Sequence, residues 1–197
     1  MPRKFAITGH IACGKSTVAE MLESLGWEII DADQVVRELY EPSQEGHKRV
    51  LDTFGACVLK SDQTIDRAAL AQIVFSDPSK LELLNSLIHP LVRQSIESRL
   101  AASLKTNPNK RIVCVIPLFF ETHDHYAFDA IVCVGASASV QKERLLAQGL
   151  SPNDIEKRLM AQWPMEKKIE KSNHLIWNNG SLEHLKAQVM HLHRLWI

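Results

Sequence analysis

The feature that most constrains this chain is a glycine-containing run near its start, Gly9 to Thr17, which follows the apolar stretch 5–8. The run reads GHIACGKST and matches the phosphate-loop pattern G-x-x-x-x-G-K-S/T between an expected strand and an expected helix. Glycines let the backbone wrap closely around phosphate oxygens, while successive N–H groups and the following helix N-terminus supply partial positive charge. We therefore expect the chain to bind a nucleoside triphosphate, with Lys15 reaching the β and γ phosphates and the Ser16 hydroxyl ligating Mg2+.

The composition is that of an ordinary globular protein with one sizeable core. The chain has 197 residues, of which 45% are hydrophobic and 23% are charged. Lysine plus arginine equal aspartate plus glutamate at 23 each, so no global positive charge favours nucleic acid or an anionic membrane as a partner. The start of the chain lacks the long apolar segment of a signal peptide, and no run approaches membrane-spanning length. We expect a cytoplasmic protein that is a monomer or a weak homo-oligomer.

The cysteines are scattered singly, without the C-x-x-C pairs typical of zinc or redox centres. They are Cys13, Cys57, Cys114 and Cys133, and we interpret them as reduced, small hydrophobic residues. Cys13 has two interpretations, because a thiol beside Lys15 and a helix N-terminus can have a lowered pKa and react with oxidants, whereas a loop residue can contribute its backbone alone. We prefer the second, because thiol chemistry needs exposure.

Two histidine pairs, His123-x-His125 and His191-x-His193, raise the question of a metal site. Residues two apart diverge on a helix, though not on a strand, and no third ligand with suitable spacing accompanies either pair. We expect solvated histidines at these positions.

Five short apolar runs predict the strands of a sheet. They cover residues 4–8, 28–30, 111–116, 130–134 and 174–177. The runs alternate with helical patterns, which implies an α/β fold of three layers, with a five-stranded parallel sheet covered by helices on both faces. Ligands of such sheets bind beyond the carboxyl ends of the strands. Four residues fall there: Gly9, Asp31, Pro117 and Gly135.

Two long segments interrupt the sheet pattern. Residues of about 34–105 are mostly helical with turn signals of their own, which predicts a helical subdomain over the cleft. Residues of about 141–171 carry Arg144 and Arg158 and predict a small helical lid. In the last helix, expected at 182–196, an apolar stripe is expected to pack on the sheet. The core of a single domain is then formed by residues 1–33, 106–140 and 172–197.

Asp31 and Asp33 follow the second expected strand. Residues two apart on an extended chain project to the same side, so both carboxylates can face the γ-phosphate region. Such a pair can hold a water on Mg2+ and receive a proton from an attacking hydroxyl, which makes Asp33 the candidate base. The alternative is that an aspartate caps the helix expected at 34–40.

Further short motifs follow the phosphate loop in order and span nearly the whole chain. They are Ile30-Asp31-Ala32-Asp33, Phe54-Gly55, Ile65-Asp66-Arg67, Leu84-Asn85 with Ile88-His89-Pro90, Pro117-Leu118 with Glu121, Gln141 with Arg144-Leu145, Arg158 with Gln162, and Asn178-Asn179-Gly180. In these motifs the sequence resembles the dephospho-CoA kinases. The resemblance implies a P-loop NTPase-like kinase of the cytoplasm that transfers the γ-phosphoryl group of ATP to the 3′-hydroxyl of the dephospho-CoA ribose, the last step of coenzyme A biosynthesis.

The resemblance also implies roles for individual residues. The ATP site would comprise Gly9, Ala12, Cys13, Gly14, Lys15, Ser16, Thr17 and, near adenine, Asn179, with Ser16 as the metal ligand. The acceptor site would comprise Asp31, Asp33, Arg67, His89, Pro90, Pro117 and Leu118, with the helical subdomain binding CoA. Catalysis would fall to Lys15, Asp33, Arg144 and Arg158, the arginines flanking the transferring phosphoryl group.

Some of these residues also have plainer explanations. The pair His89-Pro90 is typical of a helix-entry turn, because the residue before proline avoids the helical region. Arg144 and Arg158 can be ordinary surface residues, although Gln162, four residues after Arg158, favours a shared site on one helix face.

Several positions depart from the pattern of the family. His10 and Ala12 stand where the family often has glycine and another small residue. Gln63-Thr64 replaces a common Asp-Gly turn, and Gln148 replaces a common arginine. The third expected strand ends without an acidic residue, so Mg2+ would rely on Ser16, phosphates, waters and the aspartate pair.

A phosphate loop alone does not choose between a kinase, a switch and a motor. A guanine-nucleotide switch needs an Asn-Lys-x-Asp base-reading motif, which this sequence lacks. A nucleoside or nucleotide monophosphate kinase would share the loop, the lid and the arginines, so acceptor preference has to separate it from a dephospho-CoA kinase.

Overall fold

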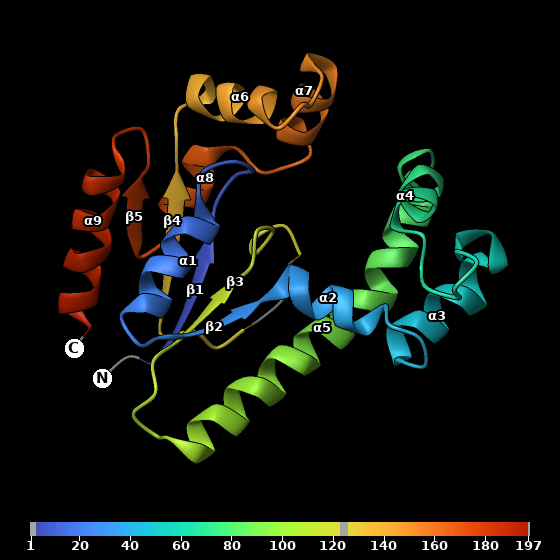
Figure 1. Ribbon diagram of the computed structural model, residues 1–197, viewed down its shortest axis with the longest axis horizontal. Helices are drawn as coiled ribbons and strands as arrows, with labels where there is room; N and C mark the ends of the chain where they lie inside the picture. The colour runs from blue at the N-terminus through green and yellow to red at the C-terminus, as the bar shows by residue number, and fades with distance from the viewer. Residues whose placement is uncertain (1–2, 123–125, 197) are drawn as a thin grey trace. The chain divides into compact units, whose positions relative to one another are not determined.

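Five parallel strands form one sheet in the part of the chain that the structure, a computed structural model, describes: residues 3–122 and 126–196 (Figure 1). The strands are β1 (Lys4–Thr8), β2 (Glu28–Asp31), β3 (Ile112–Val115), β4 (Ala130–Gly135) and β5 (His174–Trp177), in the order β2-β3-β1-β4-β5. The predicted five-stranded parallel sheet is confirmed. β1 and β5 have the predicted bounds, β2 and β4 extend one residue further, and β3 is one residue shorter at each end.

The chain divides into two compact units. We call Met1–Asp31 with Ala102–Ile197 the sheet unit, and Ala32–Ala101 the helical unit. The complete helices of the sheet unit are α1 (Lys15–Ser24), α6 (Ala138–Ala147), α7 (Pro152–Met160), α8 (Met165–Glu170) and α9 (Leu182–Leu195).

Apolar side chains cover both faces of the sheet, because helices pack on both. The helices α1 and α9 lie side by side on one face (Figure 1), over a core that includes Phe5 of β1 and Val113 of β3. Helix α8 packs on β4 from the other face, where the Sδ atom of Met165 lies 3.8 Å from the Sγ atom of Cys133. A strand covered on both faces reads as a continuous apolar run, which explains why the sequence pattern found the inner strands β1, β3 and β4.

Helix α9 buries most of the apolar stripe expected in the last helix. Leu185, Val189, Leu192 and Trp196 belong to the core cluster, whereas Leu182 is 60% exposed. Trp196 follows the helix as its C-cap and stacks on Phe5 with 4.0 Å between the ring centroids. The C-terminal helix is therefore part of the core, as its apolar stripe predicts.

The edge strand β5 is covered by a side chain of α9. The Nε2 atom of Gln188 donates to the carbonyl oxygen of Trp177 at 3.0 Å, and its Oε1 atom accepts from the N–H of the same residue at 2.9 Å. One amide group thus satisfies both backbone groups that Trp177 directs away from the sheet.

The helical unit contains no strand within the part of the chain that the structure describes. Its elements are α2 (Ala32–Leu39), α3 (Glu45–Phe54), the 3-10 helix η1 (Ala56–Val58), α4 (Arg67–Phe75) and α5 (Pro78–Thr106), of which α5 continues into the sheet unit. Asp66 caps α4 by accepting from the N–H groups of Ala68 and Ala69. Although α5 has 29 residues, neither it nor any other described helix is long and apolar enough to cross a membrane.

The interpretation of His89-Pro90 as a helix-entry turn is wrong. Pro90 lies inside α5, twelve residues after its first residue. A proline there cannot donate a backbone hydrogen bond to the carbonyl four residues earlier, a cost of about 3 kcal/mol in an isolated helix. The buried residues Ile88, Leu91 and Val92 around it supply packing that offsets this cost.

Candidate active site

The phosphate loop connects β1 to α1 through residues with positive φ. The angle is 139° at Gly9, 59° at Ala12 and 91° at Gly14. A Cβ atom at Gly9 would lie 2.0 Å from the carbonyl oxygen of Val134, and one at Gly14 would lie 2.3 Å from Asn178 Nδ2. Both glycines of the pattern are therefore required by backbone geometry and by space. Ala12 adopts the left-handed conformation with a side chain, at a cost of about 1–2 kcal/mol.

The N-terminus of α1 has no side-chain cap among the described residues, and its first turn contains no acidic residue. Within the described part of the chain, helices α3 and α8 also lack a side-chain cap, but each has an acidic residue in its first turn, and Ser137, Ser151 and Ser181 cap α6, α7 and α9 by accepting from backbone N–H groups. The first N–H groups of a helix lack acceptors within the helix and carry partial positive charge. The start of α1 can therefore receive an anion such as a phosphate group.

The side chain of Lys15 lies along the loop. Its Nζ atom donates to the carbonyl oxygens of Gly9 at 3.1 Å and His10 at 2.8 Å. Ser16, the next residue, is exposed on the first turn of α1. The lysine charge and the serine hydroxyl thus lie at the helix end that can receive the anion.

Arg144 of α6 is brought to the same loop. Its Nη1 atom donates to the carbonyl oxygen of Ala12 at 3.1 Å, and its Nη2 atom donates to that of Asn178 at 3.0 Å. Asn178 in turn donates from Nδ2 to the carbonyl oxygen of Cys13 at 2.9 Å. The predicted site residues Ala12, Cys13 and Arg144 are therefore in one hydrogen-bond network, through a residue that follows β5.

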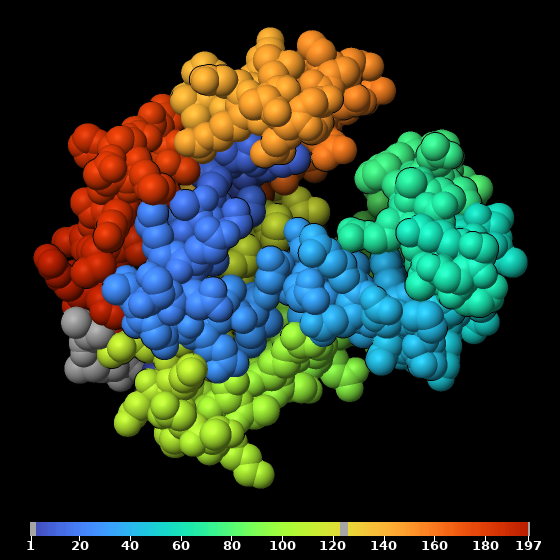
Figure 2. Space-filling view, viewed as in Figure 1, coloured from blue at the N-terminus to red at the C-terminus, as the bar shows by residue number. Residues whose placement is uncertain are grey.

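The link between α7 and α8 also contacts the loop. Gln162 Oε1 accepts from the N–H of Ile11 at 3.0 Å. The ring atom Nε2 of His10 lies 2.6 Å from the carbonyl oxygen of Trp163, which can only accept, so the ring donates. Figure 2 shows α6 and α7 (orange) lying over the N-terminal segment that contains the loop (blue).

Burial decides the interpretation of Cys13. Its side chain is fully buried, and burial raises the pKa of the thiol, against the opposing effects of nearby Lys15 and Arg144. Burial also raises the pKa of Cys133 to about 11. A buried thiol with a raised pKa is a poor nucleophile, so the loop uses Cys13 through its backbone, as preferred from the sequence.

The expectation that Asp31 and Asp33 share one side of an extended chain is wrong. Asp31 is the last residue of β2, and Asp33 is already in the first turn of α2, which begins at Ala32 rather than at residue 34. The right-handed helix replaces the twofold alternation of the strand between the two residues. Both aspartates are exposed. An acidic side chain in the first turn of a helix interacts favourably with the helix dipole, so Asp33 also stabilises α2.

The remaining predicted residues are distributed over both units. Pro117 and Leu118 follow β3, and Arg158 is exposed on α7. Asn179 Oδ1 accepts from the N–H of Ser137 at 2.7 Å, which ties the end of β5 to the start of α6. In the helical unit, Arg67 is exposed at the start of α4, and His89 and Pro90 lie in α5.

Sequence reasoning missed Lys168 of α8. Its side chain is fully buried, and its Nζ atom lies 2.7 Å from Glu121 Oε1. The helical spacing could have indicated it. One face of the helix contains Met165, Lys168 and Ile169, at spacings of three and four residues from Met165. A lysine at such an apolar position needs a buried partner.

The structure describes one of the two histidine pairs that raised the question of a metal site. His123 and His125 lie outside the described residues. His191 and His193 are on α9, where His193 Nδ1 accepts from Trp27 Nε1 at 3.0 Å, so His193 is not simply solvated. Within residues 3–122 and 126–196, no group of three or more His, Cys, Asp or Glu side chains could hold a metal ion.

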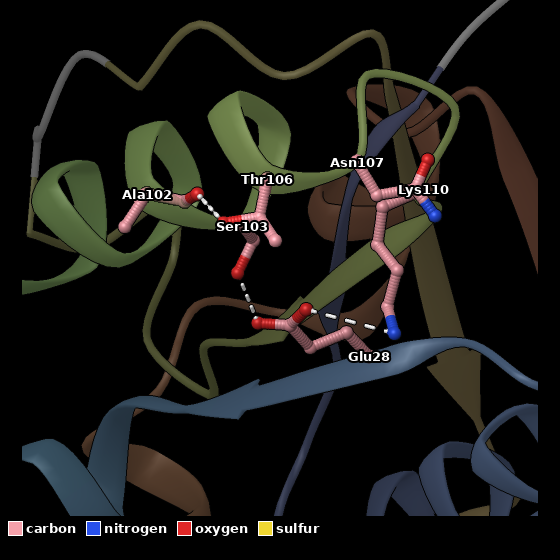
Figure 3. Close-up of a pocket in the computed structure, with 6 residues that line it drawn as sticks. All are labelled: Glu28, Ala102, Ser103, Thr106, Asn107 and Lys110. Carbon is pink, nitrogen blue, oxygen red and sulfur yellow. Dashed lines mark hydrogen bonds and ion pairs between the residues drawn. The ribbon is translucent and has the colours of Figure 1, made fainter.

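A pocket of about 280 Å3 lies at the amino end of β2, away from the phosphate loop (Figure 3). It is lined by Glu28, Ala102, Ser103, Thr106, Asn107 and Lys110. The carboxylate of Glu28 accepts from Ser103 Oγ and lies 4.0 Å from Lys110 Nζ. None of the lining residues was predicted as a site residue, and the carboxylate already has partners.

Known proteins resemble this chain along nearly its whole length. The sequence matches the dephospho-CoA kinase (CoaE) family over residues 4–184. A dephospho-CoA kinase of Chlorobaculum tepidum is 37% identical over 194 residues, which cover 96% of this chain and 92% of that protein. A dephospho-CoA kinase of Geobacillus kaustophilus is 32% identical over 197 residues, which cover 100% of this chain and 98% of that protein.

Solved structures agree in fold. A crystal structure from Thermus thermophilus has a TM-score of 0.80 at 33% identity and covers 98% of both chains. The dephospho-CoA kinase of Campylobacter jejuni has a TM-score of 0.73 at 28% identity, with 98% of this chain and 96% of that chain covered. A shikimate kinase of Bacteroides thetaiotaomicron, at 13% identity and a TM-score of 0.52, shares the fold alone. The chain belongs to the dephospho-CoA kinase family.

Proposed function

We propose that this member of the dephospho-CoA kinase family carries out the final step of coenzyme A biosynthesis by in-line transfer of the γ-phosphoryl group of ATP to the ribose 3′-hydroxyl of dephospho-CoA. The observation that carries this mechanism is the N-terminus of α1, which has no side-chain cap from the described residues and directly follows the phosphate loop. The side chains of Lys15 and Arg144 both donate to carbonyl oxygens of this loop. Phosphoryl transfer needs positioning and charge neutralisation more than covalent chemistry, and these groups supply both.

The loop would hold the ATP phosphates with backbone N–H groups of residues 12–17. Lys15 would exchange the neutral carbonyls of Gly9 and His10 for phosphate oxygens, because charged acceptors form stronger hydrogen bonds. Each terminal nitrogen of Arg144 donates one hydrogen bond to a carbonyl oxygen, and a guanidinium group has five N–H donors in all. Its remaining donors and the exposed Arg158 would neutralise charge on the γ-phosphoryl group.

The residues at the loop fit Mg2+, a hard cation that prefers oxygen ligands. The Ser16 hydroxyl is exposed on the first turn of α1, and the Asp31 carboxylate is exposed at the carboxyl end of β2. Ser16 would hold the ion, and Asp31 would add a further oxygen ligand. The bound ion would neutralise charge on the β and γ phosphates.

Four of the proposed acceptor residues belong to the helical unit. Asp33 would orient the 3′-hydroxyl and accept its proton, a role supported by its exposure two residues after the end of β2. Arg67, His89 and Pro90 would bind the CoA part in the helical unit. Arg67 is exposed, and it opposes the effect of burial that raises the pKa of Tyr40, so its charge lies near that ring.

Three further assignments complete the proposal. Pro117 and Leu118, which follow β3, would also contact the acceptor. Asn179, which is held by Ser137, would lie near adenine. The lid of about residues 141–171 would exclude water from the transferring group, since water in the acceptor position would hydrolyse ATP. The cytoplasmic location stays a prediction.

The test incubates the purified protein with Mg-ATP and either dephospho-CoA or a panel of nucleoside monophosphates, and follows ADP and the phosphorylated product by mass. Coenzyme A formed from dephospho-CoA alone is the expected result. Phosphorylation of a nucleotide would instead support a monophosphate kinase, and ATP binding without transfer would support a nucleotide switch.

A further inference from the structure

The carboxylate of Glu121 is buried and shared by two donors, one from α8 and one from the link between α7 and α8. Its Oε1 atom accepts from Lys168 Nζ at 2.7 Å and from the backbone N–H of Trp163 at 2.9 Å. The side chain of Lys168 is 0% exposed and that of Glu121 is 12% exposed. Charges this deep need partners, and here each charge has one.

The ammonium group of Lys168 is held in place at the end of β3. Its Nζ atom also donates to the carbonyl oxygen of Pro117 at 3.1 Å, and the hydroxyl of Thr8 donates to the same oxygen at 3.1 Å. Thr8 is the last residue of β1, directly before the phosphate loop. The lysine is therefore linked to the strand that precedes the loop through the carbonyl oxygen of Pro117.

Trp163 connects the carboxylate to the loop. Its N–H is bound by Glu121, and its carbonyl oxygen accepts from the ring of His10. The indole ring stacks with Phe120 at 6.1 Å between centroids, and the Nζ atom of Lys167 lies 3.6 Å from its centroid. Because the peptide unit is planar, fixing the Trp163 N–H also fixes the carbonyl group of Gln162 and the Cα atom of Trp163, to which the carbonyl group that binds His10 is attached.

From these contacts we infer that Glu121 is a positioning residue for the phosphate loop: held by Lys168, it fixes Trp163, which sets the conformation of His10 and Ile11. The neighbouring Gln162 accepts from the N–H of Ile11, so the same short link contacts two consecutive residues of the loop. Buried ion pairs are often no more stabilising than apolar pairs of the same volume, so a gain in stability is a weak explanation for this one. The inference rests on the proposed binding of ATP by the loop.

The experiment compares two double variants, Lys168→Met with Glu121→Gln and Lys168→Met with Glu121→Met. Both replace the ion pair by uncharged side chains of similar volume, and only glutamine has an amide group, whose oxygen can accept from Trp163. The measurements are the Kd for ATP by calorimetry, the KM for dephospho-CoA, the Tm, and hydrogen exchange of a peptide that covers residues 9–14.

We call the variant with Lys168→Met and Glu121→Met the Met/Met protein, and the variant with Lys168→Met and Glu121→Gln the Met/Gln protein. The Kd of the Met/Met protein for ATP should be about fivefold higher than that of the Met/Gln protein, which is the factor that one hydrogen bond of typical net strength gives. The peptide that covers residues 9–14 should exchange its amide hydrogens faster in the Met/Met protein than in the Met/Gln protein. The KM for dephospho-CoA should be the same in both, and the two Tm values should agree within a few degrees. Equal Kd values for ATP and equal hydrogen exchange of the loop peptide in the two proteins would overturn the inference. It would also be overturned if the Met/Met protein had a lower Tm together with a higher Kd for ATP and a higher KM for dephospho-CoA.

If the Met/Met protein does not fold, the link can be cut at its other end with His10→Ala. This variant should also raise the Kd for ATP and leave the KM for dephospho-CoA unchanged; an unchanged Kd would overturn the inference. The variant Lys15→Ala tests the proposed ATP site separately. Normal phosphoryl transfer by that variant would show that the loop does not bind ATP, whatever the result for the Glu121 variants.

Discussion

Asn178 Nδ2 donates to the carbonyl oxygen of Cys13 at 2.9 Å, across 165 residues of sequence. The same nitrogen occupies the space that a Cβ atom at Gly14 would need. The end of β5 therefore closes over the phosphate loop, and the loop tolerates this only because position 14 has no side chain.

Gly14→Ala should destabilise the protein by about 2–4 kcal/mol and weaken ATP binding. The positive φ of 91° disfavours a side chain, and the new methyl group would clash with Asn178. Urea unfolding and ATP titration measure the two effects. Gly14→Ala combined with Asn178→Ala should recover part of the stability by removing the clash, but not the part due to φ. A fully stable Gly14→Ala protein would contradict the described loop conformation.

Lys15→Ala should lower kcat/KM by about 10²- to 10³-fold, because it removes a charge that stabilises the transferring phosphoryl group. Steady-state kinetics with ATP and dephospho-CoA measure the change. The matched control is Lys142→Ala, since Lys142 is exposed on α6 and should leave kcat/KM unchanged. Equal effects of the two substitutions would rule out the proposed role of Lys15.

Asp33→Asn should lower kcat by at least about 10²-fold and leave the Kd for ATP unchanged, because the amide cannot accept the proton of the 3′-hydroxyl. Asp31→Asn provides the comparison. It should instead raise the Mg2+ concentration needed for half-maximal activity, since it weakens a proposed ligand. Near-normal turnover of Asp33→Asn would exclude Asp33 as the base.

A thiol reagent should modify one cysteine rapidly among the four. Cys57 is exposed, whereas Cys13, Cys114 and Cys133 are fully buried. Burial raises the pKa of Cys114 to about 12 and that of Cys133 to about 11, so their thiolate forms are scarce at neutral pH. Cys57→Ser should abolish the rapid phase. A rapid phase that persists in this variant and disappears with Cys13→Ser would show a reactive loop thiol.

The stability of the fold should fall as the pH drops from 7.5 towards 5, in part through His174. Burial, and to a lesser degree the nearby His191, lower the pKa of His174 below its ordinary value of 6.5. Below pH 6.5 the unfolded chain therefore binds a proton at this residue before the folded chain does, which favours unfolding. His174→Gln should reduce the loss of unfolding free energy between these pH values, measured by urea titration. An unchanged pH dependence would argue against this contribution.

Local patterns in the sequence predicted the sheet and the phosphate loop. The inner strands β1, β3 and β4 are short apolar runs buried on both faces, and the loop glycines are needed for backbone conformation, so both leave a signal within a few residues. Boundaries were less accurate where two local signals competed: Asp31 ends a strand and Ala32 already begins a helix, so the predicted alternation through Asp33 failed.

The side-chain network around the loop could not be predicted in the same way. Glu121 and Lys168 are 47 residues apart in the sequence and meet because β3 is one neighbour of β1 in the sheet and α8 packs on β4, the other neighbour. In the sequence, Asn178 stood out only as part of a short motif, and the structure shows that it contacts the backbone of the loop. Such contacts depend on how strands are ordered in the sheet, which no single segment encodes.

The amide of Gln188 on the backbone of Trp177 has a consequence for the behaviour of the protein in concentrated solution. An open sheet edge is a template on which a second chain can add a strand, and this is a common start of aggregation. At Trp177 that template is already taken by a side chain of the same molecule. Gln188 thus acts as an intramolecular substitute for the neighbouring strand that β5 lacks on its outer side, and it favours a sheet that ends with its own fifth strand.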